Sequence, residues 1–439
     1  MNPLDSSTRR TVGIVIVSLL LTLVGLAWWL RPHDDGIPQG MGLSRLLWEE
    51  ERWRQQDFQK GIALNDTPLW EIQEGLAVRA GITTAGVKGL VRRAVNASDL
   101  TYQAEGRLLA GNLDLAAALF EKIASTPTLP PETRAHAWHR RADALWRIGE
   151  SGVPVALHHA LDLLPPHAAE SRRIIEADLA LWHWGLANFH PENIAAELQG
   201  AQAALHRWLA LTPPADPAAQ TAAQTAARWL LGRVQLRQAC LPGTAPAETD
   251  PQLLQARETL TTALSIASEE SQPTVWAAIH QDLGRAWLET RLRHPDSPDA
   301  VVLTAAEHFR QALTQRTGLS APTAFADVRD LERRASEHLE STAFLALTLA
   351  LGPDPASAAK FADETLRSVV ATDPGPSWLL ATLAHALVEK AAHTGLPTAA
   401  ARSEAAAALK FYPFDQIGQP GVPSRDQVLQ ILTGLLPPP

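Results

Sequence analysis

The sequence contains very little sulfur and almost no tyrosine. Cys240 is the only cysteine in 439 residues, which excludes an intrachain disulfide, a thiolate zinc cluster and haem attachment through a C-x-x-C-H motif. Met and Tyr occur twice each whereas Trp occurs 14 times, so indole rings supply most of the bulky packing groups. Hydrophobic residues still make up 46% of the chain, with an excess of Ala and Leu, which favour helices. The composition therefore predicts a mostly helical protein.

Blocks of basic residues are also absent. The formal charge is −9 at pH 7, and lysines and arginines are interspersed among aspartates and glutamates. A nucleic-acid-binding domain gathers basic side chains on one face or along one helix. We therefore expect no nucleic-acid partner.

One long uncharged run does occur, at residues 11–30 (TVGIVIVSLLLTLVGLAWWL). At about 1.5 Å per residue it spans the roughly 30 Å of a bilayer core. The run is longer than a usual signal-peptide core and ends in Trp28 and Trp29, where an aromatic belt would lie, rather than in a cleavage site. These features predict a transmembrane helix with Trp28 and Trp29 as its interfacial anchor; a cleaved signal peptide is the alternative.

The charges beside this run predict its orientation. Arg9 and Arg10 precede the span, whereas Arg31 follows it and is soon balanced by two aspartates. The positive-inside rule then makes residues 1–10 a cytoplasmic tail. In a bacterium the protein would cross the inner membrane once, with the bulk of the chain in the periplasm.

Helical segments follow a linker rich in proline and glycine at residues 31–42. An N-terminal helical region, residues 43–97, is expected to hold three amphipathic helices at 43–60, 68–79 and 84–95, because apolar residues recur there at helical spacing. No strand-like alternation separates them.

From residue 98 onward a pattern of small and large residues recurs. Second helices carry Ala116, Phe120 and Ile123, then Ala305, Phe309 and Ala312, then Ala401, Ala405 and Ala408; first helices carry Trp138, Ala142 and Gly149, Leu231 and Gly232, and Leu283, Gly284 and Trp287. This spacing resembles the tetratricopeptide repeat, a 34-residue helix pair. The resemblance implies an all-α fold, an α-solenoid of TPR-like pairs behind the transmembrane helix.

The array is divided where the spacing is interrupted. We expect TPR-like units over 98–212, further units with an insertion over 213–320, and a helical region with a degenerate unit over 321–423. Residues 424–439 are expected to form a terminal capping helix that begins with a capping box at Ser424. Stacked pairs share one core, so the last pair needs such a lid.

The resemblance also implies a binding surface. First helices of such repeats line a groove that holds a peptide or a partner's helix, and fixed offsets from the small residue give the positions that contact it. These partner-binding positions are His136, His139, Asp143 and Arg147 in one unit, Arg233 and Arg237 in another, and Gln281, Arg285 and Glu289 in a third. We expect protein partners at this surface.

Motifs for chemistry are incomplete. Residues 81–88 (GITTAGVK) lack the Lys directly after the second Gly and the following Ser or Thr of a phosphate loop, so we expect no nucleotide. Ser357 and Lys360 have the S-x-x-K spacing, but the companion S-D-N and K-T-G motifs are missing. None of the histidine pairs has the H-E-x-x-H arrangement, so we expect no metal and no cofactor.

These observations favour a membrane-anchored, non-catalytic scaffold or assembly factor for an envelope complex. Two alternatives stay open. One is a cell-wall or polysaccharide-acting enzyme on a helical superhelix or toroid, since acidic residues are plentiful and their separation in space is unknown. The other is a structural element that associates with copies of itself.

Overall fold

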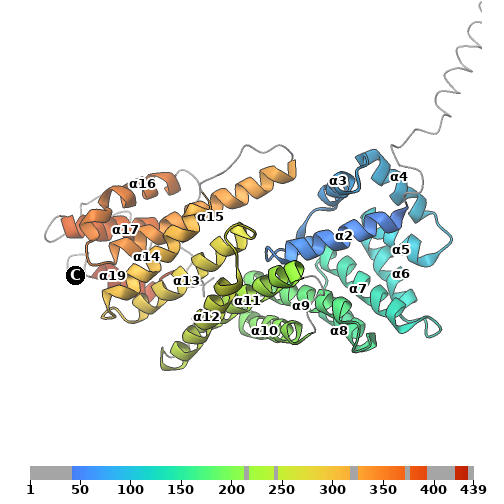
Figure 1. Cartoon of the computed structure of the whole chain (residues 1–439), viewed down its shortest axis with the longest axis horizontal. Coiled ribbons are helices and arrows are strands. Elements are labelled where there is room, and N and C mark those ends of the chain that lie inside the picture. Colours follow the sequence, from blue (N-terminus) through green and yellow to red (C-terminus); the bar gives the residue numbers. More distant parts are fainter. Residues whose placement is uncertain are drawn as a thin grey trace, which may run out of the picture. The chain divides into compact units, whose positions relative to one another are not determined.

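All regular elements in the described part of the chain are helices (Figure 1). The computed structural model describes residues 42–211, 217–241, 246–316, 325–370, 376–392 and 421–433. Within them no helix is both long and apolar enough to cross a bilayer. The transmembrane helix predicted at 11–30, with Trp28 and Trp29, lies outside the described residues and stays a prediction. The repeat positions Ala401, Ala405 and Ala408 also lie outside them.

The helices form two compact units. Unit 1 comprises Met1–Glu50 and Pro68–Ala116, and unit 2 comprises Glu51–Thr67 and Ala117–Pro439. Residues 51–67 belong to unit 2 because they pack with helices far later in the chain.

Unit 1 is built from short helices whose ends carry recognisable caps. It contains α3 (Leu69–Ala80), α4 (Thr84–Val95) and α5 (Leu100–Leu109), together with the start of α2 (Leu43–Phe58) and of α6 (Leu113–Ala124). Gly81 ends α3 at a φ of 68°, a left-handed conformation that favours glycine. The Thr83 hydroxyl then accepts a hydrogen bond from the Gly86 amide at 3.0 Å and starts α4. Of the two glycines of the apparent phosphate loop, Gly81 thus lies in the turn that ends α3 and Gly86 lies in the first turn of α4.

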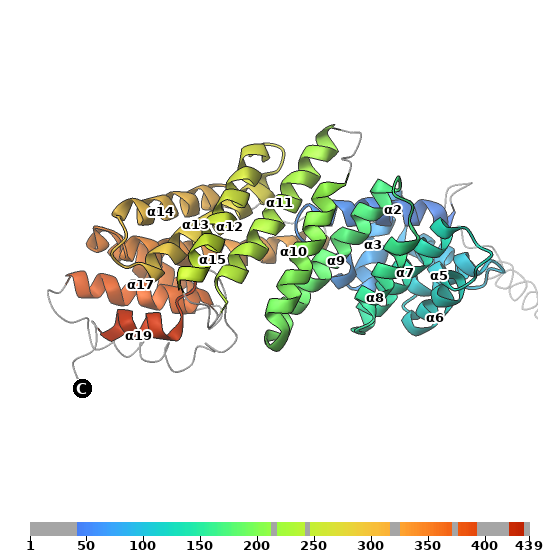
Figure 2. The ribbon, with the colours of Figure 1, turned by 90° about the horizontal axis from the view of Figure 1, so that it is seen from below.

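Unit 2 is a succession of helix pairs. The pairs are α7 (Pro131–Ile148) with α8 (Val153–Leu163), α9 (Ala169–Phe189) with α10 (Ile194–Ala210), α11 (Pro217–Ala239) with α12 (Pro246–Ile266), and α13 (Pro273–Arg293) with α14 (Asp299–Thr314). α15 (Phe325–Ala350), α16 (Ala359–Val370) and α17 (Pro376–Ala392) pack together after them, and α19 (Arg425–Thr433) is the last described helix. Each pair also contacts the next, and Figure 2 shows α9 to α12 side by side in that order. The prediction of an all-helical array of adjacent pairs is confirmed, and it is consistent with a solenoid.

Close crossings hold the pairs together. A Cβ atom added at Gly284 of α13 would lie 2.8 Å from the ring of Phe309 in α14, and one at Gly232 would lie 2.6 Å from Leu260. Phe309 is fully buried and stacks on Phe344 with 5.4 Å between ring centroids. At the crossing of α13 and α14 a small residue of one helix, Gly284, thus meets a large ring of the other, Phe309.

This packing predicts opposite effects for one substitution at two helical glycines. Gly284→Ala should destabilise the protein by about 1–3 kcal/mol, because the new methyl group meets the ring of Phe309. Gly185→Ala in α9 should stabilise it by about 0.5–1 kcal/mol, because nothing lies within 4 Å of the added atom and alanine restricts the unfolded chain. Thermal melts of both variants followed by circular dichroism measure the signs; equal signs would contradict the packing argument.

Candidate functional site

Residues 51–67 lie against the first helices of unit 2 and are tied to them by buried charges. Arg54, only 5% exposed, donates hydrogen bonds to Asp143 of α7 at 2.8 Å and to Asp178 of α9 at 3.1 Å. Asn65 accepts from Arg54 at 3.0 Å and donates to Asp143 at 2.9 Å. Residues 51–67, α7 and α9 therefore share a buried polar network, and this network covers the part of α7 that was predicted to bind a partner.

The same network includes two more charged groups of α7. His139 Nε2 lies 2.7 Å from Asp178, and Arg140 donates to Asp143 at 2.5 Å. Burial alone would raise the pKa of Asp143, but the guanidinium groups of Arg54 and Arg140 outweigh burial and hold that pKa far below its usual range. Burial would lower the pKa of His139, yet its hydrogen bond to Asp178 and the nearby carboxylate charges raise it.

The three acceptor groups could in outline form a metal site. His139, Asp143 and Asp178 offer ligand atoms within 4.8 Å of one another. Two guanidinium groups already contact these carboxylates, however, and a divalent cation beside them would face strong repulsion at low dielectric. We therefore assign this cluster to structure and not to metal binding.

Residues near the end of α7 also bind this segment, through its backbone carbonyl groups and through the Asp66 side chain. Arg147 donates to the carbonyl oxygens of Thr67 at 2.8 Å and Asn65 at 3.2 Å, and Trp146 donates to Asp66 at 2.9 Å. Burial raises the pKa of Asp66 against the opposing effects of Trp146 and Arg147. Predicted groove residues of α7 thus hold the chain's own residues 64–67.

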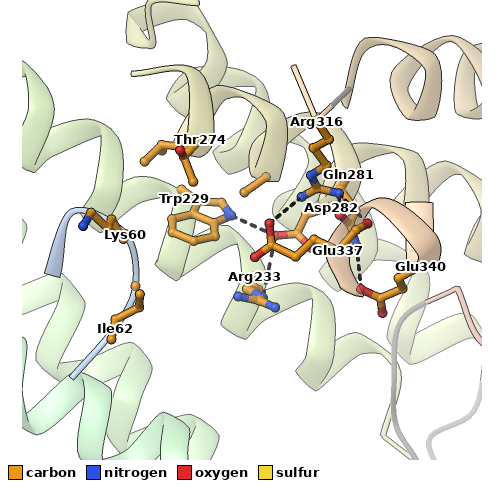
Figure 3. Close-up of a pocket in the computed structure, with 13 residues that line it drawn as sticks. Lys60, Ile62, Trp229, Arg233, Thr274, Gln281, Asp282, Arg316, Glu337 and Glu340 are labelled. Atoms are coloured by element: carbon orange, nitrogen blue, oxygen red, sulfur yellow. Dashed lines mark hydrogen bonds and ion pairs between the residues drawn. The ribbon is translucent and has the colours of Figure 1, made fainter. Parts of the chain in front are cut away.

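Beside the turn of this segment a pocket of about 200 Å³ opens between Lys60, Gly61 and Ile62 and the helices α11, α13 and α15. Figure 3 shows Lys60 and Ile62 on one side, the acidic residues of α15 on the other, and Trp229 with Arg233 between them. Its lining includes two of the predicted groove residues, Arg233 and Gln281.

Trp229 and Asp282 line the middle of the pocket and are hydrogen-bonded to each other. The Trp229 Nε1 atom donates to Asp282 Oδ2 at 2.8 Å, and Arg285 approaches the other carboxylate oxygen at 3.5 Å. Arg233, one third exposed, has its Nε atom 3.7 Å from Asp282, beyond hydrogen-bonding distance. Its guanidinium group packs over the rings of Trp184 at 5.2 Å and Trp229 at 5.6 Å.

The acidic side of the pocket is a fixed network between α13 and α15. Glu340 accepts from Gln281 at 2.9 Å and from Arg285 at 2.5 Å. Arg316 pairs with Glu337 at 3.5 Å and donates to Gln281 and to the Ser341 hydroxyl. Burial lowers the pKa of Arg316. These contacts hold each carboxylate in place.

The remaining predicted positions serve helix ends or face solvent. Arg237 donates to Asn188 and, at 3.3 Å, to the Ala187 carbonyl in the last turn of α9. Burial lowers the pKa of Arg237 to about 10, and the charge of Arg233 contributes to a smaller extent. Glu289 pairs with Arg293 at 2.8 Å. His136 is exposed. The role of these residues in binding a partner stays a prediction. Arg237 and Glu289 are buried, whereas the resemblance implies residues exposed in a groove.

Sequence reasoning did not find several residues of this site. Trp229, Asp282 and Arg316 line the pocket, and Arg54 fills the neighbouring face, but none lies at an expected groove offset. The Trp229 indole was one of 14 with no pattern to distinguish it. No family model and no curated protein matches this chain.

A histidine pair between α13 and α14 is expected to make stability depend on pH. His280 and His308 place their Nδ1 atoms 2.9 Å apart. Burial, and then the neighbouring His308, lower the pKa of His280 to about 4. Because this folded-state pKa lies below the unfolded value of about 6.5, the stabilisation is present above pH 6.5 and is lost as the pH falls toward 4.

We expect the melting temperature of the wild type to fall more steeply between pH 6.5 and 4 than that of His280→Asn. The difference corresponds to about 1–2 kcal/mol after allowance for partial solvent screening, from about 1.4 kcal/mol for each pKa unit. Thermal melts across this range measure it, and His167→Asn, at an exposed position, is the control. Parallel curves for wild type and His280→Asn would contradict the assignment.

Proposed function

We propose that this chain is a non-catalytic scaffold or assembly factor that holds partner proteins through the open pocket of unit 2. In this proposal TPR-like pairs form the array, and residues 11–30 anchor it in the inner membrane with the bulk of the chain in the periplasm. The observation that carries the proposal is Arg233 packed over two indole rings in a solvent-accessible pocket. Trp and Arg are the side chains that dominate binding energy at protein interfaces.

The array gives a physical reason for this role. Adjacent pairs bury a continuous core, in which helices α7 to α13 share one cluster of apolar side chains. Such a core can present groups from several helices on one surface without a conformational change. The pocket draws on α11, α13, α15, the turn after α2 and Arg316 after α14, so a partner held there would contact five segments of the chain.

The alternative of a cell-wall or polysaccharide-acting enzyme calls for a carboxylic acid with a raised pKa opposite a second carboxylate across a cleft. Burial raises the pKa of Asp66, but its carboxylate accepts a hydrogen bond from Trp146 and does not line the pocket. The pocket carboxylates Asp282, Glu337 and Glu340 are bound by arginines. These contacts favour a binding role over general acid catalysis.

Capture of partners from membrane extract tests the scaffold. The full-length chain, tagged and purified in mild detergent, should enrich specific proteins. Thr274→Trp places an indole at the rim of the pocket and should reduce the enrichment by about tenfold, equivalent to about 1.4 kcal/mol. Thr261→Trp, at an exposed position of α12, is the matched control. Enrichment of no protein by the wild type would contradict the proposal.

The anchor is tested separately. Deletion of residues 1–30 should move the protein from the membrane fraction to the supernatant, because the predicted span would be removed. In intact bacterial cells, a protease added after permeabilisation of the outer membrane should digest the chain beyond residue 31. Protection from that protease would overturn the proposed orientation.

The second alternative, self-association, also has an observation in its favour. Unit 1 exposes large apolar side chains, with Trp48 46%, Trp70 49% and Val78 80% exposed. Such side chains are common at contacts between subunits. Light scattering of the full-length chain in detergent would detect a dimer or higher assembly by its mass.

A further inference from the structure

Arg233 is a cation whose hydrogen-bonding capacity is not used within the described residues. Its Nε atom is 3.7 Å from Asp282, and no hydrogen bond from its terminal amino groups is found in the described part of the chain. Trp184 and Trp229 hold the guanidinium plane from their ring faces. An arginine fixed in this way presents a fork of donors that matches a carboxylate.

The acidic residues nearby do not satisfy Arg233 because each has closer partners. Asp282 accepts from Trp229 at 2.8 Å and is also approached by Arg285. Glu340 is bound by Gln281 and Arg285, and Glu337 by Arg316. Arg285 and Arg316 balance two of the three carboxylates, and Arg233 supplies the third positive charge at 3.7 Å from Asp282. What Arg233 still offers a ligand is therefore its unused hydrogen-bond donors and not an excess of charge.

Two further features of the opposite wall favour an anion. The Lys60 side chain is 45% exposed, and its contact with Asp57 is long at 3.4 Å. The first turn of α13, with Thr274 and Val275, also lines the pocket, and the beginning of a 21-residue helix carries partial positive charge. Positive groups therefore face the space in front of Arg233 from two separate elements.

The volume of the pocket and the charges of its lining restrict which anion it can hold. The space of about 200 Å³ has apolar walls at Ile62, Val275 and Ala278, which suit the methylene groups of a short side chain. The three pocket carboxylates would repel a dianion such as a phosphate group more strongly than a monoanion. A carboxylate on a short aliphatic stem fits both conditions.

We propose that this pocket binds the carboxylate of an acidic side chain on a partner polypeptide, with Arg233 as the recognition group. The carboxylate lies against the Arg233 fork, Lys60 adds charge from the facing wall, and the stem packs on Ile62 and Val275. The inference rests on the proposed function and names the chemistry of the partner. It also places the partner's segment beside residues 60–62, where the chain's own segment turns.

Labelled peptides test the recognition directly. Fluorescein-labelled Gly-Ser-Gly-Leu-Glu-Leu-Gly-Ser-Gly amide and its Gln counterpart are titrated with the full-length chain in detergent, and anisotropy gives Kd. The Glu peptide should bind at least about tenfold more tightly, and the preference should shrink as salt is raised because it is electrostatic. Equal Kd values for the two peptides would overturn the proposal.

Variants separate recognition from folding. Arg233→Met replaces the charged group with an uncharged side chain of similar length and should reduce the preference for Glu to less than about twofold. Lys60→Met should reduce it by about threefold, in line with a weaker exposed charge. Arg310→Met is the matched control, since Arg310 also has a 3.7 Å contact with a carboxylate but lies on α14 outside the pocket. Retention of the full preference in folded Arg233→Met would exclude Arg233 as the recognition group.

The remaining outcomes distinguish this inference from the scaffold proposal. A third peptide with Gln at the centre and a free α-carboxylate tests a chain terminus; tighter binding of that peptide would replace the acidic side chain as the ligand. Binding of no peptide up to about 1 mM, near the weak end of specific affinities, would overturn the site. Partner capture would then decide the scaffold independently.

Discussion

Replacement of Arg54 by methionine is expected to lower the unfolding free energy of unit 2 by about 3–5 kcal/mol, because a buried ion pair is broken and its partners stay buried. Asp143 and Asp178, 1% and 4% exposed, would both lose their bonds to this guanidinium. Arg140 and His139 could compensate only in part. Hydrogen exchange of α7 and α9 measures the loss as opening at least about a hundredfold more frequent.

The surface pair of Arg367 and Asp363 provides the control for Arg54. These side chains are also an arginine and an aspartate in contact, but they are 74% and 40% exposed. Arg367→Met should change stability by less than about 0.5 kcal/mol. A similar loss in both variants would mean that burial of the Arg54 network does not set its contribution. A double variant, Arg54→Met with Asp178→Asn, should lose less than the sum of the single losses.

Phe309→Ala is expected to have an effect of similar size, about 3–5 kcal/mol, for an apolar reason. The ring is fully buried, lies on Gly284 and stacks on Phe344, so its removal leaves a cavity between α13, α14 and α15. Phe309→Leu refills most of that space and should lose less than about 1.5 kcal/mol. Denaturant unfolding followed by far-UV circular dichroism compares the two; a small loss for both would show that the neighbouring helices collapse into the space.

Local spacing explains why some of the fold could be predicted. The Gly284 and Phe309 positions follow from the small and large residues of a repeating pair, and the structure brings them together. At the C-terminal helix, the backbone N–H of Gln427 donates to the Ser424 hydroxyl at 3.3 Å, and the Gln427 side-chain oxygen accepts a hydrogen bond from the Ser424 backbone N–H at 2.7 Å. Both features depend on residues close in the chain or on one helix pair, which a pattern of letters can express.

The binding surface could be predicted only in part, because an offset on a helix does not say what lies opposite. Asp143 has the same sequence signature whether it faces water or Arg54, and the two residues are 89 positions apart. Gln281 and Arg233 do line a pocket, but Glu340, which closes the network, lies in a stretch without visible repeat spacing. Which predicted positions are buried and which line the pocket therefore depends on charge pairs between residues far apart in the chain, and local sequence patterns do not show such pairs.

The place of residues 51–67 among helices of unit 2 has a consequence during synthesis. Arg54 leaves the ribosome 124 residues before Asp178, a delay of about ten seconds at ordinary rates of translation. Throughout that interval the partners of this segment in α7 and α9 are not all made. A long loop must then close before Arg54 and Asp178 can pair. The first-made part of unit 2 thus stays without its buried partners until α9 has been made, and the nascent chain needs protection of this segment during that interval.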